Sequence, residues 1–306
     1  IAAQSPDGYI GNYPDELRFG NRGWDVWGVK YTLMGLLHHF DATGDEKSLA
    51  AAKRLVDFMI GHFTGGKDVL PMRYTGCFGG LPSCSSLEPV VWLYRRTGEK
   101  RYLEFASYIV RELTEFADGP QLLKLAKVPV GDRRLEVVPE CRSQIAKDRL
   151  EHQLLKAYEM MSCHQGLLDY YEVTGDRRYL EATLAMAESI VRDELYVTGG
   201  CTAGECWHHG REHQNEPITW MQETCVVTTW MRLCEKLLTV TGDPKWADYL
   251  ERAFYNVYLA ALNRDGSAFA AYTPVNGDRS TGHHHCRMHT NCCNANGPRG
   301  FLTVLR

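Results

Sequence analysis

The sequence predicts an all-α protein built from helical hairpins that stack side by side. One phrase recurs along the chain, as DATGDEKSLAAA, RRTGEKRYLEFA, EVTGDRRYLEAT and TVTGDPKWADYL. Before and after each copy, apolar residues repeat at a spacing of three to four, which is the period of an amphipathic helix. We therefore expect each copy to connect the two helices of one hairpin.

The residues of this phrase favour a sharp connection between helices. Its glycine can adopt the left-handed conformation that ends a helix, and the residue after the glycine can cap the next helix. The glycines are Gly44, Gly98, Gly175 and Gly242, followed by the caps Asp45, Asp176 and Asp243 and by the weaker cap Glu99. The predicted hairpins span about 24–63, 85–117, 152–195 and 223–263.

The copies are unevenly spaced, which favours a closed toroid with long loops over a uniform solenoid. Gly-rich, cysteine-bearing stretches at 74–84 and 196–210 lie between the hairpins. In a helical toroid such loops gather at one end, and loops on a rigid frame usually carry the chemistry. The stretch 266–276 alternates in polarity and predicts a short strand. No low-complexity linker divides the chain, so we expect a single domain over 1–306.

Charge and composition exclude several classes of partner. The 306 residues carry a formal net charge of −4 without a basic cluster, which argues against nucleic acid and anionic membranes. No apolar run approaches the roughly 20 residues that a membrane span needs. The first residues show neither the charged nor the apolar segment of a signal peptide.

The chain contains 11 cysteines, an odd number without regular spacing. Buried free thiols, a metal site, or both are therefore expected rather than a disulfide framework. Thiols that must stay reduced or metal-protected favour the cytoplasm. A periplasmic or secreted location stays open if an N-terminal signal is missing.

Near the C-terminus two cysteines, Cys292 and Cys293, are adjacent. With Glu223 and Cys225 they form a set of four ligands of the types that zinc accepts. Glu223 and Cys225 are two residues apart and cannot share one helix face. They can converge on one ion if the chain is extended just before its helix.

Two adjacent cysteines can both reach one ion only from a tight turn, and turn-forming residues flank the pair at Asn291, Asn294 and Gly297. Two buried thiols or a strained disulfide between neighbours are the other interpretations open at this point. The histidines at 283–285 are better explained as an exposed polar loop, or as a source of one pocket side chain, than as zinc ligands.

Five motifs, YVTGGCTAGE, QETC, LERAFYN, FAAYTPVN and CCNANGPRG, occur in this order. By that order and spacing, the region from about Tyr158 to the end resembles glycoside hydrolase family 127, typified by β-L-arabinofuranosidases. The first half shares the hairpin pattern and the opening DGYIG (Asp7–Gly11). The family fold is an (α/α)6 barrel followed by β-sandwich domains. About four hairpins are recognisable here, so the resemblance implies an incomplete (α/α)6 catalytic domain without the β-sandwich.

The resemblance also implies an activity and a site. The activity is that of a retaining exo-glycosidase on plant-type glycans, with Cys292 as nucleophile and Glu205 as general acid/base. The implied zinc ligands are Glu223, Cys225, Cys292 and Cys293. The implied sugar-binding residues are His164, Glu251 and Tyr272. A coordinated thiol loses its proton, and a thiolate so held is ready to attack an anomeric carbon.

Other features leave alternatives open. The same four ligands fit a closed structural zinc site in a non-catalytic carbohydrate-binding or scaffold protein. Histidines of the family are missing from 27–35 and 81–91, which leaves the identity of the sugar open, and the oligomeric state is open as well. The remaining cysteines are expected to be buried small hydrophobes, although Cys201 and Cys206 could bridge each other. Trp24, Trp27, Trp207 and Trp220 are core residues or stacking platforms for a sugar ring.

Overall fold

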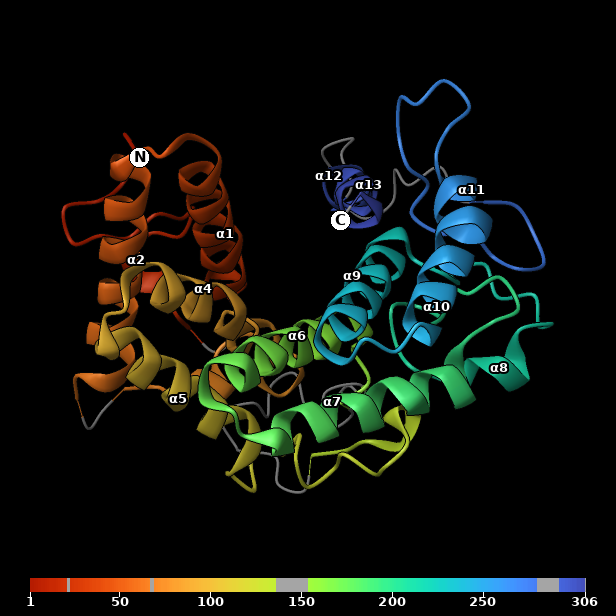
Figure 1. Cartoon of the computed structure of the whole chain (residues 1–306), viewed down its shortest axis with the longest axis horizontal. Coiled ribbons are helices and arrows are strands. Elements are labelled where there is room, and N and C mark those ends of the chain that lie inside the picture. The colour runs from red at the N-terminus through yellow and green to blue at the C-terminus, as the bar shows by residue number, and fades with distance from the viewer. Residues whose placement is uncertain (21–22, 67–68, 136–153, 280–291, 306) are drawn as a thin grey trace. The chain divides into compact units, whose positions relative to one another are not determined.

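The computed structural model describes residues 1–20, 23–66, 69–135, 154–279 and 292–305. These residues form two compact units. Figure 1 shows their helices, coloured by residue number from the N-terminus to the C-terminus. The first unit comprises Ile1–Leu125, Arg134–Leu154 and Ser162–Ala182, and the second comprises Ala126–Arg133, Leu155–Met161 and Thr183–Arg306. The single domain expected over 1–306 therefore stays a prediction.

The first unit is a set of packed helices with short 3-10 turns between them. Its helices are α1 (Asp25–Thr43), α2 (Glu46–Thr64), α3 (Leu81–Cys84), α4 (Leu87–Thr97) and α5 (Lys100–Thr114). Its 3-10 turns are Asp15–Leu17, Met72–Tyr74 and Phe78–Gly80. Helix α1 packs against α2, and α4 packs against α5. The division between the two units falls within α6 (Ala157–Thr174) and α7 (Arg177–Ser189).

The second unit holds the remaining elements. They are the 3-10 turn Val130–Asp132, the π turn Ile190–Glu194, α8 (Gly210–His213), α9 (Thr224–Thr241), α10 (Lys245–Ala253), the π turn Phe254–Tyr258, α11 (Leu259–Ala261), α12 (Cys292–Asn296) and α13 (Pro298–Val304). Helix α9 packs against α10, α12 and α13. Two large rings, those of Trp230 and Trp246, are fully buried in this unit.

The four predicted hairpin connections are confirmed. Gly44, Gly98, Gly175 and Gly242 all have a positive φ, between 67° and 74°. The carboxylates of Asp45, Asp176 and Asp243 each accept a hydrogen bond from the backbone N–H two residues further on, at 3.2, 3.1 and 3.1 Å. The predicted weaker cap makes no such side-chain bond. These connections are local, because each depends on one glycine and its immediate neighbours.

Helix α5 illustrates how the apolar period becomes a core. Its buried side chains include Tyr102, Phe105, Ile109 and Leu113, which lie at intervals of three or four residues. Each such side chain contributes about 1.5–3 kcal/mol by leaving water. The same helix carries Glu112, which is 2% exposed and pairs with the Arg73 guanidinium at 3.0 Å.

The predicted strand at 266–276 is wrong in detail. Within the part of the chain that the structure describes, this stretch forms an isolated antiparallel bridge between Leu262 and Phe269 instead. A turn at Asp265–Ser267 closes the bridge, and no second strand extends it into a sheet. The all-α prediction is confirmed, and none of the described helices is long and apolar enough to cross a membrane.

Candidate active site

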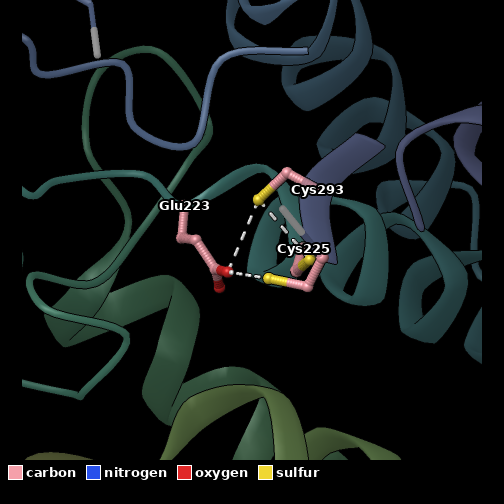
Figure 2. Close-up of side chains that lie close together, drawn as sticks. Glu223, Cys225 and Cys293 are labelled. Atoms are coloured by element: carbon pink, nitrogen blue, oxygen red, sulfur yellow. Dashed lines mark hydrogen bonds between the residues drawn. The ribbon is translucent and has the colours of Figure 1, made fainter. Parts of the chain in front are cut away.

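Glu223, Cys225, Cys292 and Cys293 lie together in the second unit. One ligand atom from each residue lies within 4.8 Å of the others. The Sγ atoms of Cys225 and Cys293 are 3.5 Å apart, and the Sγ atoms of Cys292 and Cys293 each lie 3.5 Å from Glu223 Oε1. Figure 2 shows Glu223, Cys225 and Cys293 with their side chains turned toward one another. We refer to these four residues as the Glu/Cys cluster.

The start of helix α9 places the first two members of the cluster. Glu223 caps α9 with φ −57° and ψ 130°, so the chain is still extended there, and Cys225 lies in the first helical turn. Of the stretch expected to be extended, only Glu223 is, because Thr224 and Cys225 already belong to α9. Thr224 fixes the junction, because its N–H and its hydroxyl donate to the carbonyls of Ala271 and Ala270 at 3.0 and 2.7 Å.

Helix α12 places the two adjacent cysteines, so the expected tight turn is wrong. Cys292 and Cys293 are the first residues of α12, and they are thiols rather than a disulfide. The expected turn residue Asn294 instead anchors the helix by accepting a hydrogen bond from the Phe269 N–H at 2.7 Å. Gly297 packs so tightly that a Cβ would lie 2.5 Å from the Phe269 ring.

The cluster gathers acidic groups that favour their neutral forms when no cation balances them. Burial raises the pKa of Glu223, and the charges of Glu205 and Cys292 raise it further. Hydrogen bonds that the Cys225 thiol shares with Cys292 and Cys293, with Cys225 donating to Cys293, raise the pKa of Cys225, and burial raises it further. A divalent cation would take the place of these protons, since thiols and carboxylates bind metals in their deprotonated forms.

The geometry fits tetrahedral coordination. With Zn–S near 2.3 Å and Zn–O near 2.1 Å, tetrahedral ligands lie about 3.8 Å apart for two sulfurs and about 3.6 Å apart for sulfur and oxygen. Three of the six separations between ligand atoms are 3.5 Å, close to both values, and the other three are no larger than 4.8 Å. Three members of the cluster are buried, whereas Cys292 is exposed.

Glu205 lies on the loop before α8, where two side chains fix its carboxylate. The Lys156 ammonium forms an ion pair with Oε2, and the Tyr272 hydroxyl donates to Oε1 at 3.3 Å. Burial lowers the pKa of Lys156, but the charges of Glu159 and Glu205 outweigh it and raise that pKa overall. Lys156 therefore stays charged beside Glu205.

Sequence reasoning missed Lys156 and Glu159. They stand in LLKAYEMM, which has only the apolar period of a helix start and no motif of its own. Lys156 meets Glu205 across 49 residues of chain. One feature of the sequence could have indicated them. Two charged residues interrupt an otherwise apolar run, and a charge that is buried requires a partner.

The loop that carries Glu205 is held by backbone pairing and contains strained residues. Ala203 bridges Met221, the Gly204 N–H donates to the Trp220 carbonyl at 2.7 Å, and the 222 N–H donates to the 202 carbonyl at 3.1 Å. Four non-glycine residues between 202 and 222 have positive φ: Thr202 at 76°, Glu205 at 66°, His209 at 57° and Gln222 at 53°. Each costs about 1–3 kcal/mol, and strain of this kind concentrates at functional sites.

The other predicted residues have different surroundings. Tyr272 is buried beside Glu205, as described above, whereas Glu251 is exposed on α10. His164 is buried on α6, in the first unit. Sugar contacts by Tyr272, Glu251 and His164 stay predictions. The histidines at 283–285, Asn291, Cys141 and Cys286 lie outside the described residues.

The remaining cysteines and tryptophans that the structure describes differ in bonding and in exposure to solvent. Cys201 and Cys206 are free thiols, so the bridge considered for them is absent. Burial raises the pKa of the Cys201 thiol well above its ordinary value, as expected for an inert core residue. Trp207 is 1% exposed and belongs to the core, whereas Trp220 is 61% exposed.

Comparisons with known proteins give a consistent result. The family model described as "Beta-L-arabinofuranosidase, GH127 catalytic domain" matches residues 1–304. A non-reducing end β-L-arabinofuranosidase of Bifidobacterium longum subsp. longum is 24% identical over 99% of this chain and 49% of its own length. The chain therefore spans about half the length of this curated relative.

Two solved structures have the same fold. A GH127 β-arabinofuranosidase is 22% identical, with a TM-score of 0.70 over 99% of this chain and 46% of its own. A GH127 β-L-arabinofuranosidase from Geobacillus stearothermophilus T6 is 17% identical, with a TM-score of 0.68 over 98% of this chain and 49% of its own. The predicted fold class, helical hairpins of the (α/α)6 type, is confirmed.

Proposed function

Because this chain belongs to the β-L-arabinofuranosidase GH127 catalytic-domain family, we propose that it is a retaining exo-glycosidase that removes a terminal β-L-arabinofuranosyl-type sugar from plant-type glycans. The observation that carries the proposal is the asymmetry of the Glu/Cys cluster. Three of its ligand residues are buried, and one, Cys292, faces solvent. A ligand that also reacts must be reachable by the substrate, whereas a site that only holds the fold together has no such requirement.

Zinc fits this cluster better than other common ions. Three thiols and one carboxylate favour zinc over magnesium or calcium, which prefer all-oxygen sites. Bound there, a zinc ion would keep the coordinating thiols deprotonated at neutral pH and so supply a thiolate for catalysis. Glu223, Cys225 and Cys293 would hold the ion, and Cys292 would both hold it and react.

The chemistry proposed for Cys292 and Glu205 has two steps. First, Cys292 Sγ bonds to the anomeric carbon while the glycosidic C–O bond breaks, and Glu205 gives its proton to the leaving oxygen. Second, Glu205 takes a proton from water as the water oxygen attacks the anomeric carbon, and the C–S bond breaks to return the thiolate. Two displacements at one carbon retain its configuration.

Residues around Glu205 would keep its carboxylate oriented through both steps. Lys156 and Tyr272 hold one carboxylate oxygen each, and the paired backbone at 202–204 and 220–222 supports the loop. Tyr272 also fits a role in sugar binding, since its ring lies beside the acid/base. Glu251 belongs to the same proposed sugar-binding set, and for His164, in the first unit, sugar binding is carried over from the family resemblance alone.

The test is the replacement of Cys292 by serine. C292S should retain the fold but lose hydrolysis of an aryl β-L-arabinofuranoside by at least about 10³-fold, because an alcohol is not ionised at neutral pH. A sugar electrophile that reacts with thiols should label Cys292, as read by peptide mass spectrometry. The matched control is C77S, at a half-buried thiol of the first unit, which should keep full activity.

Two results would contradict the proposal. One is full activity in C292S. The other is a labelled cysteine other than Cys292. If the protein binds zinc and plant-type glycans but the wild type never hydrolyses them, the non-catalytic carbohydrate-binding alternative is correct.

A further inference from the structure

Trp220 is an exposed tryptophan attached to the loop of the proposed acid/base. Its side chain is 61% exposed, whereas Trp207, Trp230 and Trp246 of the same unit are buried. Leaving so large an apolar ring in water forgoes about 1.5–3 kcal/mol of burial. An aromatic ring kept exposed beside a reactive group is a common feature of ligand sites.

The position of Trp220 is fixed relative to Glu205 by short-range contacts. The Trp220 carbonyl accepts a hydrogen bond from the N–H of Gly204, the residue before Glu205, at 2.7 Å. The Trp220 ring stacks on Tyr272, with ring centroids 5.9 Å apart and an angle of 11° between the planes. Tyr272 in turn donates its hydroxyl to Glu205 Oε1. The indole, the phenol and the carboxylate therefore form one continuous row.

The order of this row indicates which part of a glycan each group meets. Glu205 must reach the oxygen that links the released sugar to the rest of the glycan. Tyr272 is buried and lies next to the carboxylate, while Trp220 lies one ring further out and has a large exposed surface. A group joined to the leaving oxygen and extending toward solvent would pass the indole.

We propose that Trp220 is a stacking platform for the sugar ring on the leaving-group side of the scissile bond, which makes this protein selective for glycans with a second sugar at that position. This inference depends on the proposed function, because it takes Glu205 as the acid/base. The apolar C–H face of a sugar ring would pack on the indole, as rings pack on aromatic side chains elsewhere.

The experiment compares two substrates that differ only in the leaving group. One is a β-L-arabinofuranosyl disaccharide, and the other is methyl β-L-arabinofuranoside. In W220A, KM for the disaccharide should rise about three- to tenfold, the effect of losing one aromatic contact. For the methyl glycoside, kcat/KM should change by less than about twofold, and W220F should behave as the wild type on both.

A control variant and a binding measurement complete the test. Tyr255 is 63% exposed in the π turn Phe254–Tyr258, so Y255A controls for the loss of an exposed ring. Saturation-transfer NMR with the free leaving-group sugar should show contact with the wild type and not with W220A. This measurement does not require turnover, so it tests the platform even if the protein hydrolyses neither glycoside.

Three outcomes would overturn the inference. Equal losses on both substrates would mean that Trp220 acts only through Tyr272 and Glu205. Unchanged kinetics on both substrates would mean that the ring has no role. Undiminished NMR contact in W220A would place the leaving-group sugar elsewhere.

Discussion

Removing the proposed zinc ion from the Glu/Cys cluster should destabilise the second unit by a predictable amount. A ligand that binds only the folded state at about 1,000 times its Kd stabilises it by about 4 kcal/mol. For a unit of about 140 residues, each kcal/mol shifts the melting temperature by about 2–4 °C. We therefore expect a strong chelator to lower the melting temperature by about 8–16 °C.

The structure explains why the loss should be large. Glu223, Cys225 and Cys293 are almost fully buried, and among the described residues no disulfide joins the segments that carry them. A metal would connect the start of α9 to α12 across 68 residues. Without it, the thiols and the carboxylate must take up protons, because burial raises the pKa of Glu223 and hydrogen bonds with Cys292 and Cys293 raise the pKa of Cys225.

The assay is differential scanning calorimetry on the full chain, with metal content measured in the same samples. Zinc should restore the original melting temperature at one equivalent, whereas magnesium, which prefers oxygen ligands, should not. C225S should melt like the chelated wild type, and C234S, at a buried thiol away from the cluster, should keep its zinc. A sample that loses its metal and melts at the same temperature would refute this reasoning.

Three further predictions concern other parts of the molecule. R73M should lower the free energy of unfolding by about 3–5 kcal/mol in urea titrations, because Glu112 stays buried without its cation. The double variant R73M/E112Q should recover most of the lost stability, and a double variant as unstable as R73M would contradict this. G297A should reduce zinc retention on dialysis, because the Cβ of the new alanine would meet the Phe269 ring. G35A is the control and should retain zinc fully, because a Cβ at position 35 in α1 would meet nothing. Equal zinc retention in both variants would contradict the idea that the packing of Gly297 on Phe269 supports the cluster. Burial, followed by the charge of His213, lowers the pKa of His208 to about 4. The folded state therefore holds His208 neutral, and the free energy of unfolding should fall as the pH drops from about 6.5 toward 4. H208Q should flatten that part of the plot of melting temperature against pH, and an unchanged plot would assign the effect to other groups.

The helical hairpins were predictable because their signals are local. Gly44 and Asp45 close one helix and cap the next through contacts within four residues, and the same holds at Gly242 and Asp243. The strand expected at 266–276 was wrong because alternation alone does not supply a pairing partner. The described residues form only isolated pairings there, the bridge between Leu262 and Phe269 and a bridge residue at Tyr272, and no strand.

The ligand set was predictable for a different reason. Three thiols and a carboxylate match zinc by chemical type, and the order of motifs matched a family, so Glu223, Cys225, Cys292 and Cys293 could be named before any geometry was known. The way in which the adjacent cysteines are presented was not predictable. They open a short helix rather than a turn, because Asn294 and Gly297 are used to pack α12 against Phe269.

The sequence by itself determined the all-α hairpins, their connections and the residue types of the cluster, since these depend on backbone preferences and ligand chemistry. Only the tertiary structure decided that Cys292 is exposed while Cys293 is buried, that Lys156 meets Glu205, and that Trp220 stays in water. The physical reason is range. The exposure of a side chain and its choice of partner depend on segments tens of residues away in the chain. A short stretch of sequence does not indicate which distant segment will pack against it.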